Sequence, residues 1–166
     1  MKISFTKHPK KGMILTLTRT DGTQTWSPIR PGLEMHDLAH YAAEEILGWQ
    51  EGFFGLVNLG YTTEDFELPR DQRPEPLLPK NLPVQSIQGE HLVNLLQVDY
   101  LNAGFGEPFT TMFRRVLEEK DLPYPDEVTE ERVIEIKTRL QELMYQYSTL
   151  EEGQSLELIF SPVVRK

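Results

Sequence analysis

Two of the four histidines in this chain, His36 and His40, stand four residues apart in a segment with helical character. Residues at that spacing lie on the same face of a helix, with Cβ atoms about 5–6 Å apart. Neutral imidazoles placed in this way can converge on one divalent ion such as zinc, whose bonds to nitrogen are about 2.0–2.1 Å long. The spacing therefore predicts a metal site that a ligand from another element completes.

Asp37 lies between these histidines, and the segment is similar to the H-E-x-x-H helix of zinc-dependent proteases. In those enzymes the carboxylate activates a metal-bound water, so the resemblance makes Asp37 a candidate catalytic base. Aspartate is one methylene shorter than glutamate, and the following residues lack the third histidine of the extended protease motif. The resemblance is therefore confined to this short motif and does not extend to protease activity.

Glu44 continues the stripe of His36 and His40 as a further candidate ligand. Eight residues of helix rise about 12 Å, so one ion cannot bind all three side chains. Either the two histidines share an ion with a ligand from elsewhere, or His40 and Glu44 do. The remote candidates for the missing ligand are His91, Glu90, Asp65, Glu64 and Asp99.

The same segment also has an ordinary structural interpretation. Asp37 is well suited to cap the N-terminus of a helix. If it does so, His36 lies outside the helix and the shared face disappears. With both histidines inside the helix, they can still be boundary residues that hydrogen-bond to the backbone or to a carboxylate. The sequence leaves metal binding, catalysis and a structural role open.

The wider pattern His-Asp-Leu-x-His-Tyr-x-x-Glu, followed by Gly-Phe-Phe-Gly-Leu-Val, resembles a segment of uncharacterised bacterial proteins over about residues 35–60. This resemblance is to no characterised family, and it implies no activity. The sequence also has no Gly-x-Ser-x-Gly motif, no phosphate-binding glycine loop and no dinucleotide fingerprint. Serine-hydrolase and nucleotide chemistry therefore lack their usual sequence support.

The elements that must position these residues begin with a sheet. Alternation of apolar and polar residues predicts three short antiparallel strands within the first thirty residues, with Asp-Gly marking the second turn. The same alternation over 155–161 predicts a last strand. A lone hairpin is only marginally stable, so the last strand is expected to join the N-terminal sheet. The predicted fold is α+β, with a four-stranded, mainly antiparallel sheet packed by about four helices.

Apolar residues spaced by three and four predict the helices between these strands. A short additional helix is expected in the aromatic stretch 49–60. Residues 61–88 contain five of the twelve prolines and fit neither periodicity, so they are expected to form an extended strap over the core of a single domain, 1–166. The four main helices are expected over about 36–47, 89–103, 107–120 and 129–147.

Composition limits the classes of partner and site. The net charge is −9 and the cations are not gathered in one cluster, which argues against nucleic acid and anionic membranes as partners. There is no cysteine, so disulfides, thiolate metal ligands and cysteine nucleophiles are excluded. No stretch resembles a signal peptide or a membrane helix of about 18 apolar residues, and the cytoplasm is the expected location.

Two functions follow from these observations. The first is a non-enzymatic interaction or accessory module, supported by the lack of a complete catalytic set and by the apolar segment 49–60. The alternative is a divalent-metal-binding protein, with hydrolysis as one option, built on His36 and His40 with Asp37 as its base. Whether the chain is an enzyme, which protein or small molecule it binds, and its oligomeric state are left open by the sequence.

Overall fold

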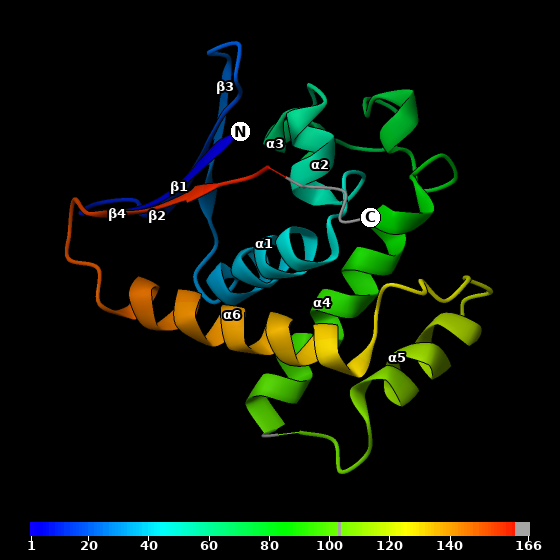
Figure 1. The fold of residues 1–166 in the computed structure, drawn as a ribbon. Helices are drawn as coiled ribbons and strands as arrows, with labels where there is room; N and C mark the ends of the chain where they lie inside the picture. The colour runs from blue at the N-terminus through cyan, green and yellow to red at the C-terminus, as the bar shows by residue number, and fades with distance from the viewer. Residues whose placement is uncertain (103, 162–166) are drawn as a thin grey trace.

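A computed structural model describes residues 1–102 and 104–161 of the chain, and it shows an α+β fold (Figure 1). The four-stranded antiparallel sheet has the order β3-β2-β1-β4, so the C-terminal strand pairs with the first strand. This confirms the predicted fold class. The strands are β1 (Lys2–His8), β2 (Gly12–Thr18), β3 (Gln24–Ile29) and β4 (Ser155–Ile159).

The alternation of residue types determines which face of the sheet packs against the helices. Ile3, in the central strand β1, pairs with Leu17 of β2 on one side and with Leu158 of β4 on the other. All three side chains are buried in one hydrophobic core, while their polar neighbours face the other side. Residues from both ends of the sequence therefore contribute to the same apolar layer.

The helices form a layer over this face, with α1 at its centre, where it contacts α2, α4 and α6 (Figure 1). Two short helices, α2 and α3, precede the long helix α4. The α-helices are α1 (Glu34–Leu47), α2 (Phe53–Asn58), α3 (Thr63–Glu67), α4 (Val84–Asn102), α5 (Phe109–Glu118) and α6 (Glu130–Ser148), and a 3-10 turn, η1, covers Glu75–Leu77.

The proline-rich segment 61–88 contains more regular structure than an extended strap. Helix α3 begins after Thr62, whose side chain forms a reciprocal capping box with Asp65. Helix α4 begins at Val84, directly after Pro83, whose carbonyl accepts the backbone N–H groups of Ser86 and Ile87. The predicted end of this helix, at residue 103, lies outside the described residues.

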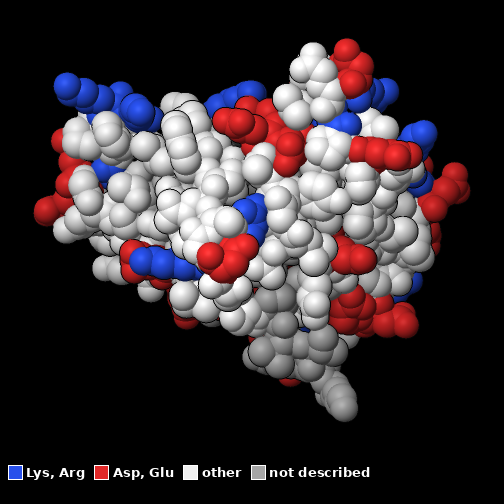
Figure 2. All heavy atoms as spheres, turned by 90° about the horizontal axis from the view of Figure 1, so that it is seen from above, with Lys and Arg blue, Asp and Glu red and all other residues white. Residues whose placement is uncertain are grey.

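The charged residues show no continuous basic surface on the face seen in Figure 2. Blue and red side chains stand there in separate small groups between wide areas of other residues. The absence of nucleic acid partners and the cytoplasmic location stay predictions. Within 1–102 and 104–161, no helix combines the length and the apolar composition that crossing a membrane requires.

Candidate metal centre

Helix α1 begins early enough to contain both histidines. Its N-cap residue is Leu33, so Asp37 lies inside the first turns rather than at the cap. The preceding turn is closed by Gly32, which has a φ of +91° and donates its N–H to the Glu34 carboxylate at 2.7 Å. The alternative in which His36 lies outside the helix is therefore not the observed one.

His36 and His40 lie on the same face of α1 with their rings in edge-to-face contact, 4.7 Å between centroids. Their Nε2 atoms are 3.2 Å apart. Two N–H groups cannot face each other at that distance, so at least one Nε2 presents its lone pair to the other. The helix thus brings two imidazole donors to one point.

A third donor comes from α4, which crosses α1 at this position. Glu90 Oε1 lies 3.3 Å from His40 Nε2, and Glu90 Oε2 lies 3.8 Å from His36 Nε2. In a tetrahedral site with bonds of about 2.0–2.1 Å, two donors are about 3.3 Å apart. Among the described residues, this is the only group of three or more His, Asp or Glu side chains with donor atoms close enough for one ion.

The Nδ1 atom of each histidine also has a polar neighbour. His40 Nδ1 lies 3.6 Å from Glu44 Oε1, and the Gln97 side-chain amide lies 3.0 Å from His36 Nδ1. A histidine that binds metal through Nε2 usually donates its Nδ1–H to a carboxylate or carbonyl. Glu44 is placed to accept such a bond. Gln97 presents its amide nitrogen to His36 Nδ1, and the same nitrogen donates to the Val93 carbonyl at 3.4 Å, so in this arrangement Gln97 is a donor to the ring.

Glu44 is almost completely buried, at 1% exposure, because it also anchors α2. Its carboxylate accepts the backbone N–H groups of Phe54 at 3.2 Å and Gly55 at 3.0 Å. A side chain at Gly52 would overlap this carboxylate, so the glycine provides the space that Glu44 occupies. Glu44 thus lies behind His40 and is not one of the three converging donors.

Burial and neighbouring charges separate the pKa values of the two histidines. Burial opposes protonation of His40, but the Glu44 and Glu90 carboxylates outweigh it and raise its pKa to about 9. Burial and the positive charge of His40 lower the pKa of His36 to about 4, against the attraction of Glu90. At neutral pH, in the metal-free cluster, His40 is therefore the positively charged imidazolium and His36 is neutral.

The cluster is closed on one side and open on the other. The His40 side chain is 4% exposed, whereas the Glu90 side chain is 53% exposed. Solvent can therefore reach the three donor atoms from the side of Glu90. Three protein ligands with one open position are typical of catalytic zinc sites, whereas structural zinc sites usually have four protein ligands.

Asp37 lies outside the three-donor cluster, on the wall of a neighbouring cavity of about 420 Å³. Burial raises the pKa of its carboxyl to about 6, with His40 acting against this shift and Glu34 and Glu90 adding to it. Phe53 lines the same cavity, and its ring centroid is 5.8 Å from that of His40. The cavity and the cluster are thus adjacent along α1.

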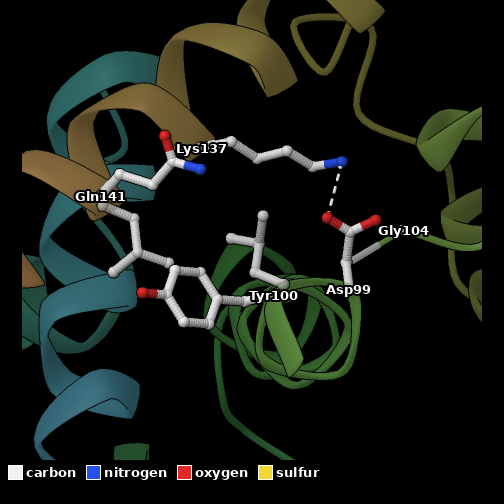
Figure 3. A pocket seen from close by; sticks show the side chains of 7 residues that line it. Asp99, Tyr100, Gly104, Lys137 and Gln141 are labelled. Carbon is white, nitrogen blue, oxygen red and sulfur yellow. Dashed lines mark ion pairs between the residues drawn. The ribbon is translucent and has the colours of Figure 1, made fainter. Parts of the chain in front are cut away.

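The other remote candidates do not join the cluster. Asp65 caps α3 through Thr62, and Glu64 is exposed on the same helix. His91 follows Glu90 on α4 but is not among the converging donors. The Asp99 carboxylate pairs with Lys137 at 2.8 Å beside a pocket of about 640 Å³ between α4 and α6 (Figure 3).

The chain shows no significant match to a protein-family model, to a curated protein sequence or to a solved structure. The geometry of the cluster is therefore the observation on which a function can be argued.

Proposed function

We propose that this chain binds a divalent transition-metal ion, with zinc as the best-matched ion, through His36, His40 and Glu90. The observation that carries the proposal is the spacing of their donor atoms, 3.2 to 3.8 Å between neighbouring pairs. Two imidazoles and one carboxylate suit zinc and related ions. Calcium and magnesium prefer sites made entirely of oxygen, and they fit this donor set less well.

The charges around the cluster support the same proposal. The Glu44 and Glu90 carboxylates face His40 from two sides. A buried charge is tolerated when it is paired, and two carboxylates balance a divalent cation as a whole. The contact of Glu44 with Nδ1 holds the His40 ring in the orientation that presents Nε2.

The proposal predicts that untagged protein, purified without metal-affinity resin, binds about one zinc ion per chain. Elemental analysis and zinc titration by calorimetry measure the stoichiometry, and cobalt substitution reports four-coordinate geometry through its visible absorption. The Glu90→Gln variant should bind zinc about 100-fold more weakly, because loss of even an outer-shell partner costs about 10–100-fold. The variant is expected to fold, since the Glu90 side chain is half exposed.

His91→Gln is the matched control, because His91 is the next residue on α4 and lies outside the cluster. It should keep the zinc affinity of the original protein. Circular dichroism checks that both variants are folded. A chain that takes up no zinc, cobalt or manganese, or that loses equal affinity in both variants, would show that the cluster is not a metal site.

An interaction role stays a prediction, but segment 49–60 no longer supports it. Trp49 is 1% exposed, Phe54 is completely buried, and Leu59 is 69% exposed. Most of these apolar residues therefore pack in the core. The catalytic role of Asp37 also stays a prediction, since its carboxylate is not one of the converging donors.

A further inference from the structure

The cavity beside the cluster has a lining that the proposed metal site does not use. Its volume of about 420 Å³ lies in the range of small-molecule sites, about 300–1,000 Å³. It is open to solvent on one side and is lined by residues of β2, β3, α1, α2 and α3. Apolar side chains form much of its wall, including Leu15, Ile29, Phe53 and Phe66.

Asp37 contributes a charge to this wall without a partner in the protein. The residue is half-buried, and none of the side-chain hydrogen bonds or ion pairs within residues 1–102 and 104–161 involves its carboxylate, whose oxygens keep access to solvent. A cationic group that donates hydrogen bonds to Asp37 forms a charge-assisted pair, which is roughly twice as strong as a neutral hydrogen bond.

Two aromatic rings also line the cavity. Phe53 and Phe66 lie with ring centroids 5.2 Å apart and planes tilted by 57°. Aromatic faces pack against apolar groups and also attract cations. The rim carries Arg30 and Glu67, which are both exposed and of opposite charge. Their charges offset each other, so the remaining charge of the lining is that of Asp37.

We propose that this cavity binds a small organic amine, with its ammonium group on Asp37 and its apolar body against Phe53 and Phe66. The ammonium supplies the hydrogen-bond donors that the carboxylate lacks, and the two rings cover the hydrocarbon part. This proposal does not depend on a metal ion, because none of the three donors of the cluster lines the cavity.

The test compares two probes that share one body and differ in charge, phenethylamine and 3-phenylpropionate. Calorimetry at pH 8 in the presence of EDTA measures both affinities with no metal bound. The amine should bind at least about tenfold more tightly than the acid, a difference of about 1.4 kcal/mol. Equal binding of the two probes, or tighter binding of the acid, would overturn the proposal.

Substitutions in the cavity and outside it test where on the protein the amine binds. Asp37→Asn keeps the shape of the side chain and should weaken phenethylamine about tenfold while leaving 3-phenylpropionate unchanged or bound more tightly. Glu64→Gln makes the same change of charge on α3 outside the cavity, so it controls for net charge and should leave both affinities unchanged. Phe66→Ala should weaken both probes. If Asp37→Asn has no effect on the amine, the amine does not bind at Asp37 and the inference is wrong.

Discussion

His40 is the residue on which the chemistry of the cluster depends. In the metal-free chain it carries a proton between two carboxylates, and in the proposed metal-bound chain it is a neutral ligand held from behind by Glu44. Both states need the same buried position, in which His40 is 3% exposed. The two carboxylates explain why a charged group is tolerated in the interior, because they pair with it.

The stability of the metal-free protein should fall as pH rises from about 6.5 to about 9. The folded protein holds the His40 proton until its pKa of about 9, whereas the unfolded chain releases it near the ordinary histidine pKa of 6.5. The stabilisation is therefore fully present below pH 6.5 and is lost as pH approaches 9. The loss is on the order of 3 kcal/mol at most. Urea denaturation in EDTA at several pH values measures it.

The control for this prediction is His91→Gln, which should retain the pH dependence of the original protein. A nuclear magnetic resonance titration of His40 gives the pKa directly. A stability that stays level or rises between pH 6.5 and pH 9 would contradict the assignment of the proton to His40.

At this scale, part of the candidate site could be predicted from sequence and part could not. His36 and His40 stand four residues apart in the sequence, so helix geometry alone predicts that they share one face. Glu90 was one of several remote candidates, because its approach depends on how α4 packs against α1. The outer role of Glu44 depends on backbone N–H groups ten residues away, which have no sequence signature.

At the scale of the elements, α1 and α2 are joined through one buried carboxylate. Gly52 lies at the N-cap of α2, where a side chain would occupy the space of the Glu44 carboxylate. The glycine at position 52 therefore has a steric cause. In the sequence, the apolar residues of the same segment suggested an interaction role, because residue types alone do not show what lies opposite a glycine.

Replacing Gly52 with alanine should destabilise the protein by about 1–3 kcal/mol, the range for overpacking a buried site. The added Cβ must displace the buried Glu44 carboxylate or separate α2 from α1. Thermal or urea denaturation measures the change.

Gly89→Ala is the matched control for this prediction. The added Cβ would be 3.5 Å from the Trp49 ring, an ordinary contact, and alanine favours helix α4 by up to about 1 kcal/mol. This variant should be neutral or slightly stabilised. Equal losses in the two glycine variants would show that overlap with Glu44 is not the cause.

Element boundaries show where sequence patterns are sufficient. The α6 prediction is close to the observed Glu130–Ser148, because Thr129 caps the helix and its apolar residues recur along one face. Helix α3 was missed, although Thr62 and Asp65 have capping-box spacing, because the prolines around it favoured an extended chain. A local capping signal proved stronger than the composition of the segment.

For the whole molecule, the sheet unites the two ends of the sequence. Strand β4 pairs with β1, and its inward side chains Leu156 and Leu158 are buried in the same core as Ile3 and Phe5. This pairing was predictable, because a strand with one apolar face needs a partner and the only other strand signals are N-terminal.

Truncating Leu158 to alanine should cost about 2–5 kcal/mol, as for other buried leucines. Ile159→Ala, one residue further along β4, should cost less than about 1 kcal/mol, because that side chain is 62% exposed on the opposite face. Chemical denaturation of the two variants gives the comparison. Similar losses would mean that β4 does not alternate between core and solvent as described.

The pairing of β1 with β4 also has a consequence for biosynthesis. Ile3 and Leu158 are partners in the sheet, yet nearly the whole chain separates them in sequence. On a ribosome, the β1–β2–β3 meander emerges early and waits with one edge of β1 uncovered until the last strand has left the exit tunnel. During that interval the nascent chain exposes a strand edge to aggregation, and a chaperone that shields it should raise the yield of native protein.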